Sequence, residues 1–269
     1  MSNEAFPDVR LQIENRIARV TIDRPGVRNA LRPETSEGLV GALAEARKHP
    51  EVRLLWLTGE GNAFCAGADL ADHGKLFRQA GDRSENARVH ITEVFHAIIR
   101  AVRDFPCPTM AVIPGAAVGF GFDLALACDL RVAAADAKVG PIFNHLGLVP
   151  DGGGSWTLPR LIGMTRAMEW VLTGETRRAA EVAEWGVFNR VVPLIELESA
   201  AQALADRIVA GAPRALTAAR KLLYTAQSQA FPEALAAECE AQIEMLNSRD
   251  FGEGVAAWFE HRPPQFTGE

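Results

Sequence analysis

The stretch Pro114-Gly115-Ala116-Ala117-Val118-Gly119-Phe120-Gly121-Phe122-Asp123 separates two segments of different character. Residues 110–113 before it are apolar, and residues 124–128 after it are Leu-Ala-Leu-Ala-Cys. This order predicts a buried strand, a glycine-rich turn and a helix that begins near Phe120. The glycines let the backbone approach a ligand, and the free amides of a first helical turn can hold a developing negative charge. A tight turn within an α/β core would give the same pattern, so this stretch alone leaves the function open.

A second glycine-rich stretch follows the apolar residues 54–58 and reads Gly59-Glu60-Gly61-Asn62-Ala63-Phe64-Cys65-Ala66-Gly67-Ala68-Asp69-Leu70. Asp69 is suited to cap a helix that starts just after it. Two strand-to-loop-to-helix junctions can each present one N–H group to a single carbonyl oxygen, which is what an oxyanion requires. The two stretches together favour an oxyanion site.

Composition limits the class of protein. A chain of 269 residues can bury the core of one domain, or of a domain with an appendage. Its 48% hydrophobic and 23% charged residues are typical of a soluble globular protein, and its net charge of −6 argues against a nucleic-acid partner. No segment resembles a signal peptide or is long enough to span a membrane, so we expect a cytoplasmic protein. The four cysteines lack metal-binding spacing, and no metal site is expected.

Hydrophobic periodicity predicts strands that alternate with helices, which indicates an α/β architecture. The expected strands are residues 9–13, 17–22, 54–58, 110–113, 130–134 and 187–192. The expected helices begin at Pro33 and near Phe120, cover 91–102 and 163–173, run through 156–161, and fill most of 194–262 with breaks near Pro213, Pro232 and Arg249. Residues 71–88 are charged and poorly periodic, and we expect a loop with short helical pieces there.

The segments AFCAGADL (63–70) and PGAAVGFGFDLALACD (114–129) resemble the crotonase, or enoyl-CoA hydratase/isomerase, superfamily. The resemblance extends from about residue 22 to the C-terminus through IDRPGVRNAL, LGLVPDGGGSWTLPRLIG and GVAAWFEHRPPQF. It implies a crotonase-like spiral of ββα units with a C-terminal helical region that trimerises. We therefore expect a core with the CoA thioester site in residues 1–195, a helical oligomerisation region in 196–269, and a homotrimer or a dimer of trimers.

The resemblance also implies the oxyanion donors. Crotonase-like enzymes bind an acyl-CoA thioester and stabilise an enolate at its oxygen with two backbone N–H groups, which correspond here to Ala68 and Phe120. The family usually has glycine at the second position. A side chain is tolerable because the backbone donates, provided that the ring of Phe120 points away from the thioester or walls the acyl pocket. Coenzyme A is part of the substrate, so no separate cofactor is expected.

Four further residues match the family's CoA-binding motifs. Arg28 stands where the family places a basic residue near the phosphates, although a lone arginine after a turn is more often a solvated charge. Ala66, Asp69 and Leu70 resemble the loop around the adenine and pantetheine. These assignments depend on the motif and not on spacing.

The acid and base groups depart from the hydratase pattern. Typical hydratases carry two glutamates that hold one water, and their positions correspond to Asp123 and Phe143. Because Phe143 cannot move a proton, hydration is in doubt. Asp151 stands where dienoyl-CoA isomerases, ring-epoxide isomerases and chlorobenzoyl-CoA dehalogenases have a working aspartate. Without the resemblance, both aspartates could simply be carboxylates at helix N-termini.

One carboxylate is enough for a 1,3-proton shift, so the hypothesis is an enoyl-CoA isomerase with Asp151 as the base and Asp123 assisting. The alternatives are dehalogenation or thioester hydrolysis through Asp151, 2-enoyl-CoA hydration, and a non-catalytic CoA- or RNA-binding scaffold. Dehalogenases draw a catalytic histidine from the helix that holds His96, where a structural histidine is the simpler interpretation.

Aromatic residues near the motifs suggest a bulky or aromatic acyl group, although aromatic residues are also common in protein cores. The candidate substrate-pocket residues are Phe122, Phe143, His145 and Trp156. Residues 71–90 are expected to line the acyl end of the site, and their sequence shows no pattern that identifies the acyl group.

Overall fold

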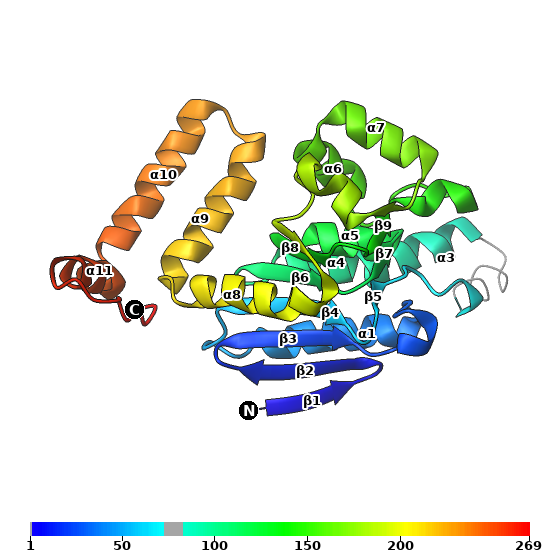
Figure 1. Cartoon of the computed structure of the whole chain (residues 1–269). Coiled ribbons are helices and arrows are strands. Elements are labelled where there is room, and N and C mark those ends of the chain that lie inside the picture. The colour runs from blue at the N-terminus through cyan, green and yellow to red at the C-terminus, as the bar shows by residue number, and fades with distance from the viewer. Residues whose placement is uncertain (1, 73–82) are drawn as a thin grey trace.

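Two β-sheets lie at the centre of the molecule (Figure 1). The structure is a computed structural model, and it describes residues 2–72 and 83–269. The larger, seven-stranded sheet consists, in order, of β1 (Ser2–Phe6), β2 (Val9–Glu14), β3 (Ile17–Ile22), β4 (Leu54–Gly59), β6 (Thr109–Ile113), β8 (Leu130–Ala134) and β11 (Arg190–Val192). The smaller, four-stranded sheet consists of β10 (Arg177–Arg178), β9 (Lys138–Gly140), β7 (Ala116–Val118) and β5 (Ala63–Cys65).

Each central strand of the larger sheet is followed along the chain by a strand of the smaller sheet. β4 leads into β5, β6 into β7 and β8 into β9, and helical segments follow each pair. The strands from β3 to β11 run parallel to one another, and β5, β7 and β9 also run parallel. This repetition is a spiral of ββα units, and it confirms the predicted α/β fold. It also places the loops after β5 and β7 side by side, because those two strands pair.

The helices begin and end where the sequence provides suitable residues. Pro33 opens α1, Gly174 in a left-handed conformation ends α7, and the Ser248 hydroxyl accepts the Phe251 amide to cap α11. The α-helices are α1 (Pro33–Ala46), α3 (Arg83–His90), α4 (His96–Arg103), α5 (Phe120–Ala127), α6 (Gly154–Ile162), α7 (Met164–Thr173), α8 (Leu197–Val209), α9 (Pro213–Thr225), α10 (Phe231–Leu246) and α11 (Arg249–Phe259).

Most of the expected elements are confirmed, and the differences are local. The helix expected over 91–102 is α4 preceded by a π-helical segment, Ile91–Phe95. The strand expected over 187–192 is shorter, because only Arg190–Val192 pairs with β8. Residues 187 and 188 are buried but form no strand pairing. The loop expected over 71–88 contains the start of α3, while residues 73–82 lie outside the described part of the chain.

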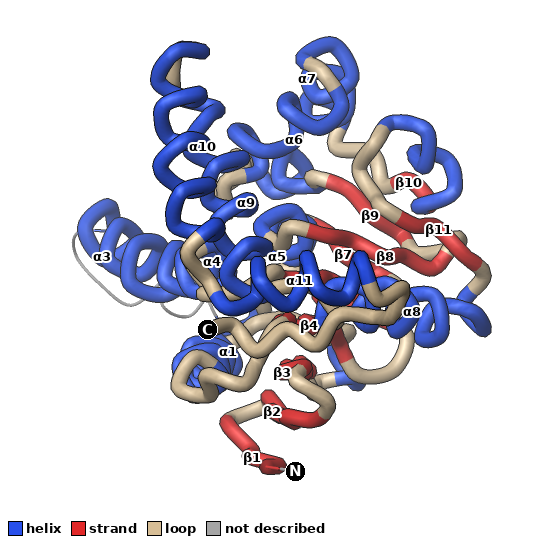
Figure 2. Tube along the Cα trace, turned by 90° about the vertical axis from the view of Figure 1, so that its left-hand side faces the viewer, coloured by secondary structure: helices blue, strands red, loops and turns tan. Residues whose placement is uncertain are grey.

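The last three helices stand on one side of the sheets (Figures 1 and 2). The helix before them, α8, packs against the larger sheet and buries three side chains, whereas α9 and α10 bury none. Large apolar side chains of α9, α10 and α11 are exposed: Leu223, Phe231, Leu235, Ile243, Leu246, Phe251, Val255, Trp258 and Phe259. No helix in the described residues is long and apolar enough to cross a lipid bilayer.

A buried polar network joins α9 to the sheets. The carboxylate of Asp129 accepts hydrogen bonds from the Thr109 amide at 2.7 Å, Arg220 Nε at 2.6 Å and the Tyr224 hydroxyl at 2.5 Å. Arg220 also donates to the Phe105 carbonyl at 3.1 Å. Asp129 and Arg220 are both largely buried, so the pair has few alternative partners in solvent.

We expect Asp129→Ala to lower the free energy of unfolding by about 3 kcal/mol, because Arg220 would be left buried without its counter-charge. Chemical denaturation would measure the loss. Glu244→Ala is the matched control, since it removes an ion pair between α9 and α10 whose side chains are solvent-exposed. Equal losses in the two variants would contradict the role of Asp129 as the anchor of α9.

Candidate active site

The loops after β5 and β7 come into contact at their glycines. A methyl group added to Gly67 would lie 3.1 Å from the Val118 carbonyl oxygen and 3.4 Å from the Phe120 nitrogen. A methyl group added to Gly121 would lie 2.1 Å from the Cys65 carbonyl oxygen, so no other residue fits there without a backbone shift. The end of β5 and the start of α5 therefore touch through their backbones.

Two backbone amides are left free at this junction. Leu31 bonds to both neighbours of Ala68: its N–H donates to the Gly67 carbonyl, and its carbonyl accepts the Asp69 N–H, each at 2.8 Å. In such a parallel bridge the N–H of Ala68 itself faces away from Leu31. Phe120 is the first residue of α5, so its amide lacks an intrahelical acceptor. Within residues 2–72 and 83–269, neither amide has a protein acceptor.

The ring of Phe120 packs inward. It is 3% exposed, its centroid lies 4.6 Å from that of Phe95, and it also approaches Gly152. Phe95 ends the π-helical segment before α4. The ring is therefore held among core side chains, and the backbone of Phe120 is left to face the junction with Ala68.

Asp151 lies in the loop before α6 and is half-buried. Its Oδ1 atom is buried and has no hydrogen-bond partner among the described residues. Burial raises the pKa of the Asp151 carboxyl, while its own backbone amide and the charge of His96 act in the opposite direction. An unpaired buried carboxylate oxygen costs free energy, so it needs an explanation such as a catalytic role.

Asp123 lies beneath the same loop. Its side chain is 1% exposed, and Oδ2 accepts the Gly152 amide at 2.9 Å. Oδ1 makes no well-formed hydrogen bond, although the adjacent Gly154 amide favours the ionised carboxyl. Burial raises the pKa of Asp123 to about 7, and the negative charge of Asp151 adds to this rise. The charge of Asp151 thus acts on Asp123 in the same direction as burial, although burial is the larger cause.

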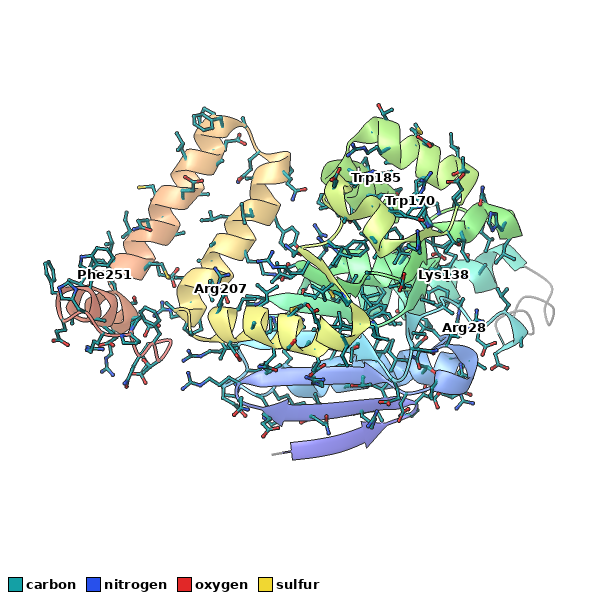
Figure 3. The ribbon with its side chains drawn as sticks, in the orientation of Figure 1. Arg28, Lys138, Trp170, Trp185, Arg207 and Phe251 are labelled. Carbon is teal, nitrogen blue, oxygen red and sulfur yellow. The ribbon has the colours of Figure 1, made fainter. Side chains whose placement is uncertain are left out.

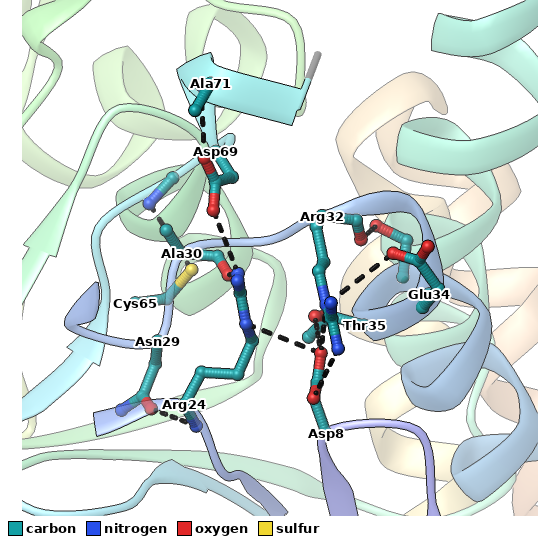
Figure 4. Close-up of polar contacts among 12 residues, drawn as sticks. Asp8, Arg24, Asn29, Ala30, Arg32, Glu34, Thr35, Cys65, Asp69 and Ala71 are labelled. Carbon is teal, nitrogen blue, oxygen red and sulfur yellow. Dashed lines mark hydrogen bonds and ion pairs between the residues drawn. The ribbon is translucent and has the colours of Figure 1, made fainter. Parts of the chain in front are cut away.

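The residues predicted to bind CoA lie along one edge of the site. Arg28 has an exposed side chain and a left-handed backbone, and its carbonyl accepts the Ala66 amide at 3.0 Å. Asp69 accepts the Ala71 amide at 3.1 Å, as a helix cap does, and pairs with Arg24 at 3.1 Å (Figure 4). The Asp69 carboxylate is thus occupied by local structure.

Arg24 is a residue that the sequence analysis missed. It donates to the Ala30 carbonyl and pairs with both Asp8 and Asp69, so it ties the start of the chain to the oxyanion loop (Figure 4). Arg24 belongs to the motif segment IDRPGVRNAL, but that segment gives no signal for its ion pair with Asp69, which lies 45 residues away along the chain. Leu70, next to Asp69, is 56% exposed.

Comparison with known proteins gives the family. The model of the enoyl-CoA hydratase/isomerase family matches residues 12–269. The chain belongs to this family. The probable enoyl-CoA hydratase of Rhodobacter capsulatus is 38% identical, with 98% of this chain and 99% of that one covered. The 1,2-epoxyphenylacetyl-CoA isomerase of Escherichia coli is 32% identical, with 96% and 97% covered. The crystal structure of an enoyl-CoA hydratase from Bacillus anthracis matches with a TM-score of 0.91 at 31% identity, covering 97% and 100%.

The sequence motifs match two positions of this chain to the glutamates of typical hydratases, and both positions are buried. Asp123 occupies the first and is sealed under the Asp151 loop. Phe143 occupies the second and is itself 7% exposed, in the 3-10 helix Ile142–Leu146. Neither position presents an accessible acid in this member of the enoyl-CoA hydratase/isomerase family.

The four predicted substrate-pocket residues differ in how deeply they are buried. Phe122 is fully buried against Trp170, with ring centroids 5.2 Å apart; Trp170 is a buried residue of α7 and is labelled in Figure 3. His145 is exposed, and Trp156 is 38% exposed. The indole of Trp156 is flanked by Arg103 and Arg160, whose guanidinium carbons lie 4.5 and 4.0 Å from its centroid. The structure thus places Phe122 in the core, whereas Trp156 lines a pocket that it shares with α9 residues such as Arg220 and Tyr224.

We expect Gly121→Ala to lower kcat/KM for a CoA thioester by about 100-fold, because its new methyl group would push the two oxyanion loops apart. Steady-state kinetics with a thermal melt would measure this. Gly252→Ala is the control, since a methyl group there meets no atom within 4 Å. An active Gly121→Ala enzyme would show that the contact between Gly121 and Cys65 is dispensable.

Proposed function

We propose that this protein is an acyl-CoA isomerase that shifts a double bond or rearranges a ring in an enoyl- or aryl-CoA thioester. Asp151 is the proton-transfer base, and the amides of Ala68 and Phe120 hold the enolate oxygen. The observation that carries the proposal is the buried Oδ1 of Asp151, which has no partner within residues 2–72 and 83–269, in a site where the second hydratase position is Phe143. A carboxylate of this kind can move a proton, whereas Phe143 cannot help to activate water.

The reaction needs one base and one oxyanion site. With a 3-enoyl-CoA, the Asp151 carboxylate removes a proton from C2, and the electron pair moves onto the thioester oxygen. The two backbone amides stabilise that oxygen, each by about 3–4 kcal/mol in a dry site. The protonated Asp151 then returns the proton to C4, which yields the 2-enoyl isomer. No atom is gained or lost, so water and a separate cofactor are not required.

Burial adapts Asp151 to this role. Its raised pKa makes the carboxylate a stronger base than an exposed aspartate. Among the CoA-binding candidates, Arg28 offers an exposed guanidinium suited to the phosphates of coenzyme A. The Escherichia coli relative, named a 1,2-epoxyphenylacetyl-CoA isomerase, supports the reaction class, while the Rhodobacter relative, named a probable enoyl-CoA hydratase, keeps hydration as the competing reaction.

A second candidate function follows from His96. His96 is the first residue of α4, and its electrostatic effect on Asp151 favours the ionised carboxyl. With Asp151 as the nucleophile, a neutral His96 would be the base. In that case the enzyme would dehalogenate or hydrolyse its CoA thioester, and it would release halide or free CoA. Isomerisation releases neither, so product analysis separates the two functions.

The assembly forms part of the proposal. The exposed apolar side chains of α10 and α11 suit a homotrimer or a dimer of trimers, in which α9 to α11 pack against other copies of the chain. The four cysteines are free thiols, which fits the proposed cytoplasmic location.

We expect Trp258→Glu to weaken the assembly, because it places a charge on an exposed apolar side chain of α11. Light scattering should show a smaller particle for the variant than for the unaltered protein. Equal masses would place the interface elsewhere.

We expect Asp151→Asn to lower kcat for isomerisation of a 3-enoyl-CoA by about 10²- to 10⁴-fold with little change in KM. A panel of 2-enoyl, 3-enoyl, dienoyl and aryl CoA thioesters, with products identified by mass spectrometry, would measure it. Asp250→Asn is the control, because Asp250 is also buried and accepts two backbone amides, those of Thr267 and Gly268. Isomerisation by Asp151→Asn at the unaltered rate would rule the proposal out.

The pH dependence gives an independent check. Only the ionised form of Asp151 is a base, and its pKa lies above the ordinary aspartate value. Activity should therefore fall as the pH is lowered, and it should fall at a higher pH than an exposed aspartate would cause. A pH profile of kcat/KM whose acid limb lies near pH 4 or below would contradict the proposed environment of Asp151.

A further inference from the structure

The carboxylate of Asp123 is enclosed by the loop that carries Asp151. A methyl group added to Gly152 would lie 2.6 Å from the Asp123 Cβ, and one added to Gly154 would lie 2.1 Å from its Oδ1. With 1% of the residue exposed, a substrate atom could reach this carboxylate only if the loop moved away. Asp123 is therefore poorly placed to exchange a proton with an acyl group.

We propose that Asp123 is a positioning residue, which fixes Asp151 through its hydrogen bond to the Gly152 amide and does not itself touch the substrate. The inference rests on the proposed role of Asp151. The Gly152 nitrogen belongs to the peptide unit that begins with the Asp151 carbonyl, so the 2.9 Å bond to Asp123 fixes the orientation of that unit. It thereby fixes the direction in which the Asp151 side chain leaves the backbone.

This role explains why a fixed bond is needed at this point. Oδ1 of Asp151 has no partner of its own among the described residues, so the side chain must be oriented through its backbone. Gly152, Gly153 and Gly154 follow Asp151, and three consecutive glycines have little intrinsic conformational preference. Asp123 supplies the constraint that these residues lack. A misplacement of about 1 Å in a reacting group can cost about 100-fold in rate.

The same contacts explain the shorter acid at a position where typical hydratases carry glutamate. One additional methylene would drive the carboxylate into the backbone of Gly152 and Gly154, which already lies against Asp123. Restoring the glutamate should therefore displace the loop and leave water addition at its original rate. Asp123, at the position of the first hydratase glutamate, therefore acts on Asp151 through the Gly152 loop and not on the substrate.

The kinetic test compares variants that keep or remove the hydrogen-bond acceptor. Asp123→Asn retains an oxygen for the Gly152 amide, so kcat should fall by less than about 10-fold, whereas Asp123→Ala should lose about 100-fold, both at nearly unchanged KM. Asp123→Glu should lose as much as Asp123→Ala and gain no hydration of a 2-enoyl-CoA. In an Asp151→Asn background, Asp123→Ala should add little, because both changes remove the same function.

Two kinetic results would overturn the positioning role. Asp123→Asn as inactive as Asp151→Asn would mean that Asp123 moves a proton, and a fully active Asp123→Ala would mean that the hydrogen bond is not needed. Asp250→Ala is the matched control, since it removes a buried aspartate that accepts backbone amides on α11. Should Asp123→Ala fail to fold, Asp123→Ser, whose hydroxyl is too short to reach Gly152, replaces it.

Hydrogen exchange separates this inference from the proposed function. Amide exchange of residues 150–154 should accelerate in Asp123→Ala and stay close to the unaltered rate in Asp123→Asn and Asp250→Ala. A fully active Asp151→Asn would remove the isomerase proposal, while faster exchange in Asp123→Ala would still support the role of Asp123 in holding the loop. Unchanged exchange in Asp123→Ala would overturn it.

Discussion

The site depends on one close backbone approach, between the end of β5 and the first turn of α5. The carbonyl of Cys65 occupies the space that a side chain at position 121 would need. Because β5 and β7 also pair in the smaller sheet, this contact fixes two loops that are separated by some 50 residues of chain. At the same place, the amides of Ala68 and Phe120 have no acceptor in the part of the chain that the structure describes. Preorganised donors of this kind cost no reorganisation when charge develops on a bound oxygen.

Two carboxyl groups lie near Phe120, since the loop at Gly152 approaches both the Phe120 ring and Asp123. Asp123 and Asp151 each have one carboxylate oxygen without a partner among the described residues, but the first is enclosed by glycine backbone and the second is only half-buried. Burial raises the pKa of both groups, but only Asp151 is exposed enough to meet a substrate. Two acids with neighbouring positions can therefore have separate roles because their accessibility differs.

The sequence predicted the elements that depend on local patterns. Apolar runs identified the parallel strands, and glycines and prolines identified the ends of α1, α5 and α7, because the chemistry of these signals acts over a few residues. The two strand-to-loop-to-helix junctions were also visible as glycine-rich stretches, and the structure brings their loops into contact. Contacts between segments that are distant in the sequence could not be predicted from local patterns. Phe122 was expected in the substrate pocket, for example, yet its ring packs on Trp170 of α7. The pairing of Arg24 with Asp69 and the enclosure of Asp123 by Gly152 also depend on tertiary packing alone.

The π-helical segment before α4 has a consequence for how such a site can change. At Ile91–Phe95 the His96 amide bonds to the Ile91 carbonyl, which accommodates one residue more than a regular helical turn. Deleting a single residue there would restore an ordinary helix and rotate the preceding residues by about 100° relative to α4. Phe95, the last residue of this segment, packs against Phe120, and His96, which follows it, acts electrostatically on Asp151. A one-codon insertion or deletion would thus change which side chains contact Phe120 and Asp151, without any amino-acid substitution.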